Sequence, residues 1–248
     1  MTWIKICGIT NLEDAQAAVQ AGADALGFVF YEKSPRNIEP DTAREIVQSL
    51  PSEVGKVGVF VDTPGRQRVE IYNAVCLTAV QSYPFSRLGY NDEKIAFSLN
   101  SFWQPPQNYL CFPMKFFLED QDRITGLAQD FARMGERRSG PENTHSSAQL
   151  DSAVLDSIFL DAGGIQEPGG TGKTFDWNKA LPIVESARGH FKVVVAGGLT
   201  PDNVGRAIAT LHPFGVDVSS GLESRPGKKD LTKIRAFIDA VREADRLQ

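Results

Sequence analysis

A thiol and an ammonium group stand two residues apart near the N-terminus. In residues 3–7 (WIKIC), the alternation of a strand places Lys5 and Cys7 on the same face. A nearby ammonium favours the thiolate, which can act as a base or a nucleophile. A cysteine at a strand end is also commonly a small buried apolar residue. From the residues alone, Cys7 is therefore either a catalytic base or a packing residue.

Two carboxylates follow other apolar runs. Asp161 ends residues 157–161 (SIFLD), and Asp217 lies within residues 215–221 (GVDVSSG). The same alternation allows both side chains to point inward, and Asp217 is placed to pair with Lys5 if its strand lies beside the first one. A thiol and a carboxyl group facing one ligand would suit acid–base chemistry.

Two loops rich in small residues have the composition of an anion site. Gly197 and Gly198 join an apolar run to a helix start, and Ser220 and Gly221 follow the next run. Glycines let backbone amides approach a ligand, and a helix N-terminus adds partial positive charge. We therefore expect a phosphate site between these loops. Two tight turns that need glycine only for their geometry are the alternative.

Residues 169–174 (GGTGKT) look like a nucleotide-binding P-loop but do not match its pattern, because the first glycine would fall at Glu167. We expect instead a flexible loop that closes over a ligand, or else a surface loop without contact.

His145, His190 and His212 lie away from strand ends, so neither a serine-type triad nor a zinc site is indicated. Cys76 and Cys111 lack the charged company of Cys7 and are interpreted as structural.

The elements that must position these residues alternate strand with helix. Eight such units favour a single (β/α)8 TIM barrel, residues 1–248, over an open doubly wound sheet. Sites in such barrels lie at the carboxyl ends of the strands. The expected strands are 3–7, 25–30, 56–61, 77–81, 109–115, 157–161, 192–196 and 215–219. The expected helices are 11–21, 41–50, 63–75, 124–134, one from 201 and 231–244, and residues 135–151 form an inserted loop.

Composition is that of an ordinary globular protein, and the length alone does not choose between one domain and two. The 248 residues are 42% hydrophobic and 23% charged, close to ordinary soluble proteins. A net charge of −5 without a basic stripe argues against a nucleic-acid partner, and the apolar runs are too short to cross a bilayer. Three widely spaced cysteines suggest reduced thiols in the cytoplasm.

Five segments, spread from the first expected strand to the last, together resemble the phosphoribosylanthranilate isomerase family. They are residues 5–10 (KICGIT), 27–36 (GFVFYEKSPR), 169–177 (GGTGKTFDW), 196–204 (AGGLTPDNV) and 215–223 (GVDVSSGLE). The resemblance implies a step of tryptophan biosynthesis, the conversion of N-(5′-phosphoribosyl)anthranilate to the 1-deoxyribulose 5-phosphate aminoketose. It implies a small-molecule substrate, no cofactor or metal, and a monomer or homodimer without a membrane or nucleic-acid partner.

The resemblance also implies roles for individual residues. Cys7 matches the general base that removes the proton from ribose C2′, and Asp161 matches the general acid that protonates the ring oxygen. Arg36 matches the cation that meets the anthranilate carboxylate, a planar pairing that guanidinium suits. Asp217 matches a position near the anthranilate nitrogen. The other residues that the resemblance implies for substrate binding are Gly172, Gly197, Gly198, Ser220 and Gly221.

One segment departs from the family. Family members often read Val-Gln-Leu-His-Gly after the fourth strand, whereas residues 80–84 here are VQSYP, and residues 90–156 are longer and more irregular than usual. Two other functions stay open on the residues alone. One is an isomerase or epimerase of another sugar phosphate, for which Arg36 would have no carboxylate to bind. The other is a barrel that binds a ligand without catalysis.

Overall fold

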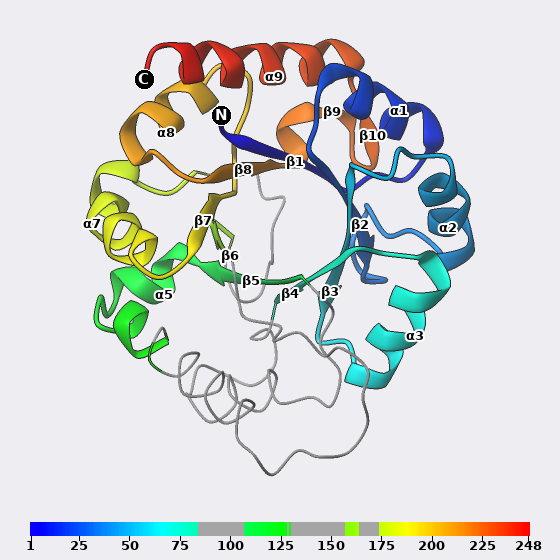
Figure 1. The fold of residues 1–248 in the computed structure, drawn as a ribbon, viewed down its shortest axis with the longest axis horizontal. Helices are drawn as coiled ribbons and strands as arrows, with labels where there is room; N and C mark the ends of the chain where they lie inside the picture. The colour runs from blue at the N-terminus through cyan, green and yellow to red at the C-terminus, as the bar shows by residue number, and fades with distance from the viewer. Residues whose placement is uncertain (84–106, 128, 130–156, 164–173) are drawn as a thin grey trace.

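The computed structural model describes residues 1–83, 107–127, 129, 157–163 and 174–248. Within them, eight parallel strands close into a barrel in the order of the sequence, with β1 hydrogen-bonded to both β2 and β8 (Figure 1). Closure confirms the predicted (β/α)8 barrel and excludes the open sheet. The strands are β1 (Trp3–Cys7), β2 (Ala25–Phe30), β3 (Gly55–Val61), β4 (Ala79–Tyr83), β5 (Asn108–Pro113), β6 (Ser157–Asp161), β7 (Lys192–Val195) and β8 (Gly215–Val218).

The described helices lie on the outside of the barrel, and a small hairpin follows its last strand (Figure 1). The hairpin strands β9 and β10 are antiparallel and stand apart from the barrel sheet. The helices are α1 (Leu12–Ala21), α2 (Pro40–Gln48), α3 (Gly65–Val75), α5 (Met114–Leu118), α7 (Trp177–Arg188), α8 (Val204–Leu211) and α9 (Leu231–Arg246); the short helix η1 (Ser220–Leu222) precedes β9 (Glu223–Arg225) and β10 (Lys228–Lys229).

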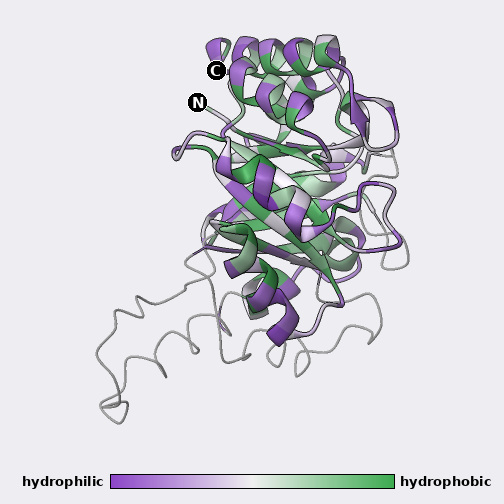
Figure 2. Cartoon of the chain, turned by 90° about the vertical axis from the view of Figure 1, so that its right-hand side faces the viewer, coloured by the Kyte–Doolittle hydropathy of each residue, from purple (hydrophilic) through white to green (hydrophobic). Residues whose placement is uncertain are grey.

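Burial explains why these runs form a parallel barrel. All six residues of β2 are buried, as expected of a strand covered on both faces. α9 turns Ile234, Phe237, Ile238 and Val241 to the core, a 3.6-residue period that leaves Arg235 on the outside. The helices accordingly mix hydrophilic and hydrophobic residues, whereas the central strands are mostly hydrophobic (Figure 2).

The start of α1 differs from what the sequence suggests. A capping box of Thr10 and Glu13 is the pattern that the residues favour. In the structure Asn11 is the N-cap and accepts from the amide of Asp14. Thr10 instead donates to the carbonyl of Gly227 at 2.5 Å. A tertiary contact thus overrides the local pattern, because the β9–β10 turn lies against this end of the helix.

Two regions of the middle differ from expectation or stay untested. β4 spans Ala79–Tyr83, not 77–81, so Tyr83 belongs to the strand and faces the barrel mouth. β5 ends at Pro113, and residues 114–118 form α5 where strand was expected to continue to 115. The described residues of the expected 124–134 helix, 124–127 and 129, are helical. The predicted inserted loop, 135–151, lies outside the described residues.

The two ends of the chain meet beside α8 and α9 (Figure 1). Asp245 accepts from the amide of Thr2 at 3.0 Å and from its hydroxyl at 2.6 Å. Arg242 donates to the carbonyl of Thr2 at 2.7 Å. These bonds tie the start of β1 to the last turn of α9. Among the described helices, none has the length and apolar character needed to span a membrane.

Candidate active site

A single pocket at the carboxyl ends of the strands brings together residues from both halves of the chain. Eight of the nine predicted site residues line it, from Cys7 on β1 to the loop after β8. The ninth, Gly172, lies outside the described residues. The eight are Cys7, Arg36, Asp161, Gly197, Gly198, Asp217, Ser220 and Gly221.

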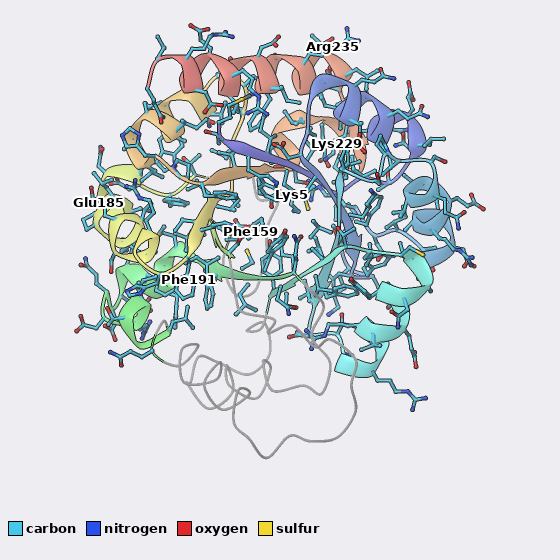
Figure 3. The ribbon with its side chains drawn as sticks, viewed as in Figure 1. Lys5, Phe159, Glu185, Phe191, Lys229 and Arg235 are labelled. Carbon is cyan, nitrogen blue, oxygen red and sulfur yellow. The ribbon has the colours of Figure 1, made fainter. Side chains whose placement is uncertain are left out.

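Lys5 and Cys7 share the inner face of β1, as strand alternation predicts. Lys5 is fully buried inside the ring of strands, near Phe159 (Figure 3), and its ammonium lies 2.9 Å from Oδ1 of Asp217. This confirms the pairing expected from adjacency of β1 and β8. Gly27 on β2 makes room for the pair, because a Cβ there would lie 2.7 Å from the sulfur of Cys7 and 3.1 Å from Cε of Lys5.

Burial and charge compete at the Cys7 thiol. Burial raises its pKa above the ordinary value, and the nearby charge of Asp217 adds to that rise. The ammonium groups of Lys5 and Lys229 oppose it, as was expected of Lys5, but burial outweighs them. The resting pocket therefore holds a thiol near neutral pH, with a thiolate population that the two lysines increase.

Asp161 has the surroundings of a carboxyl that can hold a proton. It is 5% exposed, and burial raises its pKa, helped by the charge of Asp217. The amide of Gly163 donates to Oδ1 at 2.8 Å and the hydroxyl of Tyr83 to Oδ2 at 3.2 Å, and both lower the pKa in part. Burial is thus the largest cause of the raised pKa of Asp161.

Arg36 lines the pocket, and one edge of its guanidinium is bonded to a carboxylate. Its Nε and Nη2 donate to the two carboxylate oxygens of Glu223 at 2.7 and 2.8 Å, a bidentate pairing. Lys229 also reaches Glu223, at 3.1 Å, and donates to the carbonyl of Ser219. Burial alone would raise the pKa of Glu223, but Arg36 and Lys229 together hold it below its usual value. The hairpin thus presents an ionised carboxylate that fixes the guanidinium.

The two predicted phosphate-site loops line the same pocket and lie against each other. Gly197 has φ +84°, a conformation that disfavours other residues, and a Cβ there would also meet Oδ1 of Asp161 at 2.8 Å. A Cβ on Gly221 would lie 1.9 Å from the carbonyl oxygen of Leu199. Local geometry therefore requires glycine at both positions: a positive φ at Gly197 and a close backbone approach at Gly221. A second observation favours a ligand: Ser219 lines the pocket with a buried hydroxyl that has no protein partner among the described residues.

Four side chains that bear on this site escaped the sequence reasoning. Tyr83 and Cys111 lie beside Asp161, although Cys111 was interpreted as structural. Glu223 and Lys229 reach Arg36 from a hairpin far away in sequence. Only the motif 215–223, which ends at Glu223, carried a signal for one of them. Among the described residues, no group of three metal-ligating side chains is present.

Known proteins match this chain over most of its length. The family described as N-(5′-phosphoribosyl)anthranilate (PRA) isomerase matches residues 4–82 and 121–240. The N-(5′-phosphoribosyl)anthranilate isomerase of Geobacter sp. (strain M21) is 39% identical over 96% of this chain and 97% of its own. The chain belongs to the phosphoribosylanthranilate isomerase family.

Solved structures of the family share the architecture. The phosphoribosyl anthranilate isomerase of Thermotoga maritima superposes with a TM-score of 0.70 at 35% identity, covering 98% of this chain and 100% of its own. A second, with a TM-score of 0.66 at 33% identity and the same coverage, is a family enzyme in complex with reduced 1-(o-carboxyphenylamino)-1-deoxyribulose 5-phosphate. That ligand carries a phosphate at one end and an aromatic carboxylate at the other.

Proposed function

We propose that this chain isomerises N-(5′-phosphoribosyl)anthranilate in tryptophan biosynthesis, with Cys7 as general base and Asp161 as general acid. The observation that carries the proposal is one pocket lined by a thiol, a buried carboxyl group, a guanidinium and two small-residue loops. The substrate of the family offers a matching phosphate, sugar and aromatic carboxylate. Membership of the family supports the reaction, and the side chains support the roles.

Cys7 takes the proton from ribose C2′ as its thiolate. The ammonium of Lys5, held by Asp217 at 2.9 Å, favours that thiolate, and so does Lys229. Because burial raises the pKa of Cys7, only a minor fraction is ionised near neutral pH. A thiolate that forms inside the barrel is poorly solvated and correspondingly basic toward a carbon acid.

Asp161 gives its proton to the ring oxygen as the furanose opens. A general acid must be protonated when the substrate arrives, and burial favours the neutral carboxyl. As the ring oxygen gains its proton, its bond to C1′ breaks, and removal of the C2′ proton then leaves an enaminol. The enaminol becomes the aminoketose when C1′ gains a proton and the 2′-hydroxyl loses one. C2′ is oxidised as C1′ is reduced, so no external oxidant or reductant enters.

The remaining polar groups of the pocket are proposed to bind the two ends of the substrate. Arg36 keeps Nη1 for the anthranilate carboxylate, because the described contacts of its guanidinium use Nε and Nη2. The loops at Gly197–Gly198 and Ser220–Gly221 receive the phosphate, and the buried hydroxyl of Ser219 is available to the same ligand. Asp217 lies near the reacting end beside Lys5.

A direct assay tests the proposed activity. Purified chain incubated with phosphoribosylanthranilate should form the aminoketose, followed by chromatography of the product, and should leave ribose 5-phosphate unchanged. Turnover of simple sugar phosphates but not of phosphoribosylanthranilate would support the other sugar-phosphate barrel instead. Binding of both without turnover would support the non-catalytic barrel. A cytoplasmic location and a monomeric or homodimeric state stay predictions.

A further inference from the structure

We propose that Tyr83 is the positioning residue of the general acid, its hydroxyl holding Oδ2 of Asp161 before and after proton transfer. The inference rests on the proposed role of Asp161 and concerns a residue particular to this chain. Tyr83 stands at the place of the histidine in the family's Val-Gln-Leu-His-Gly segment. It ends β4, lines the pocket, and lies 3.2 Å from Oδ2 of Asp161.

The contacts of Asp161 determine which oxygen carries the acidic proton. Oδ1 accepts from the backbone amide of Gly163 at 2.8 Å, and an amide nitrogen can only donate. Oδ1 is therefore kept as an acceptor, and the proton belongs on Oδ2. That is the oxygen beside Tyr83, so the tyrosine contacts the atom that delivers the proton.

A phenol suits this place because it can both accept and donate. Before the substrate binds, the Tyr83 oxygen can accept from the Oδ2 hydroxyl of neutral Asp161. When that hydroxyl turns to the ring oxygen of the substrate, the Tyr83 hydroxyl rotates and donates to Oδ2, and it keeps this bond to the carboxylate that remains after proton transfer. Tyr83 keeps its own proton throughout, since burial first, and the neighbouring charges of Cys111 and Asp161 second, raise its pKa well above the ordinary value.

The ring of Tyr83 is fixed from two sides. It packs against the buried cluster of Cys7, Val29 and Val59, and also against the cluster of Cys111, Phe159 and Val194. The first cluster contains the proposed base and the second borders the proposed acid. A ring held between them keeps its hydroxyl at Asp161, which fits a positioning role better than a mobile side chain would.

Besides Tyr83, titratable groups on three other strands interact with Asp161. β1 brings the ammonium of Lys5, β5 the thiol of Cys111, and β8 the carboxylate of Asp217. Of these, Lys5 lowers the pKa of Asp161 and Asp217 raises it, while the amide of Gly163 and the hydroxyl of Tyr83 both lower it. Removing the Tyr83 hydroxyl alone therefore raises the pKa of Asp161 and leaves the other contributions in place.

The pH dependence of kcat/KM reports this change, because it reflects groups of the free enzyme. The active enzyme carries the thiolate of Cys7 together with the neutral carboxyl of Asp161. The value of kcat/KM therefore has a plateau between the pKa of Asp161 and the pKa of Cys7. The acid limb follows the lower value, that of the carboxyl group, and the alkaline limb that of the thiol. Ionisation of the substrate is common to all variants, so differences between them belong to the protein.

The test compares Tyr83→Phe with the parent enzyme. We expect the acid limb to move to higher pH by about one pH unit, kcat to fall about tenfold, and KM to change less than about threefold, the scale of one lost hydrogen bond to a charged group. Tyr109→Phe is the matched control, because it removes a hydroxyl that is bonded to Gln107 at 3.0 Å near the start of β5. This variant should alter neither limb of the pH profile. Tyr83→Phe with parental kcat and an unmoved acid limb overturns the proposal.

Asp161→Asn separates this inference from the mechanism on which it rests. In the Asp161→Asn background, Tyr83→Phe should have no further effect on kcat, because the two residues act through one carboxyl group. If Asp161→Asn itself turns over like the parent, the proposed general acid is wrong. If Asp161→Asn is inactive while Tyr83→Phe behaves as the parent, only the role of Tyr83 fails. Melting temperatures near that of the parent confirm that each variant is folded.

Discussion

At the scale of single residues, the guanidinium of Arg36 has its donors divided between the protein and the proposed ligand. Glu223 accepts from Nε and Nη2, which fixes the plane of the guanidinium and leaves Nη1 outside this pairing in a side chain that lines the pocket. A carboxylate bound equally in the ground and transition states affects KM more than kcat.

Arg36→Met should therefore raise KM for phosphoribosylanthranilate by about 10- to 100-fold, the scale of a charge-assisted hydrogen bond, with a smaller loss in kcat. Arg235→Met is the control, since Arg235 lies on the outer side of α9 (Figure 3). Steady-state kinetics of both variants check the effect. An unchanged KM for Arg36→Met would mean that Arg36 does not hold the anthranilate end.

Prediction from the sequence succeeded where chemistry and strand geometry act together, and failed where partners are distant. Lys5, Cys7 and Asp217 were placed correctly because alternation and the closure of β1 on β8 determine their faces. Tyr83 was missed because residues 80–84 depart from the family's segment and the expected strand ended too early. No local sequence pattern predicts the bond between Arg36 and Glu223, which is 187 residues away.

At the scale of elements, the β9–β10 hairpin serves as the support of the pocket wall. Lys229 donates to Glu223 at 3.1 Å and to the carbonyl of Ser219, and its side chain is fully buried. Burial lowers the pKa of Lys229, and the charge of Glu223 opposes that change. The hairpin so links the loop after β8 with the residue proposed for the anthranilate carboxylate.

Glu223→Gln should raise KM by about three- to tenfold, less than Arg36→Met, because the amide keeps one hydrogen bond but loses the charge. In an Arg36→Met background it should add nothing, since its effect passes through Arg36. Glu185→Gln, on the outer side of α7 (Figure 3), is the control. Equal, additive effects in both backgrounds would show that Glu223 acts independently of Arg36.

Boundaries of elements were harder to predict than their existence. Apolar runs located all eight strands, but tertiary contacts moved their ends. Asn11 replaced Thr10 as the cap of α1 because the carbonyl of Gly227 takes the threonine hydroxyl. The interruption of β5 at Pro113, where α5 begins, has no counterpart in the alternation of apolar residues.

At the scale of the whole molecule, two sets of contacts join the first and last parts of the chain. One is the pairing of β1 with β8, and the other is the set of bonds between the chain ends. Asp245 accepts from both the amide and the hydroxyl of Thr2, and Arg242 contacts the same pair. Burial alone would raise the pKa of Asp245, but these donors hold it below the ordinary value. A depressed pKa contributes stability that is present above the unfolded pKa and is lost as pH falls through the folded one.

Asp245→Asn should therefore lower the free energy of unfolding by about 1–2 kcal/mol at pH 7, the range for hydrogen bonds to a charged group. The difference from the parent should shrink as pH falls through the depressed pKa of the folded carboxyl, where the parent carboxyl becomes protonated as well. Denaturant unfolding at pH 7 and over a series of acidic pH values measures it, with Asp239→Asn, exposed on the same helix, as control. A difference that does not depend on pH would contradict the ionic account.

The central claim is that the buried thiol at the end of β1 performs the proton abstraction. The most direct measurement is kcat of Cys7→Ala on phosphoribosylanthranilate, with Cys76→Ala, which changes an exposed cysteine, as control. We predict a fall of about 10²- to 10⁴-fold, the usual contribution of a positioned proton-transfer group, with the fold and the affinity for a product analogue retained. Turnover by Cys7→Ala close to that of the parent would contradict the claim and leave Cys7 as a packing residue.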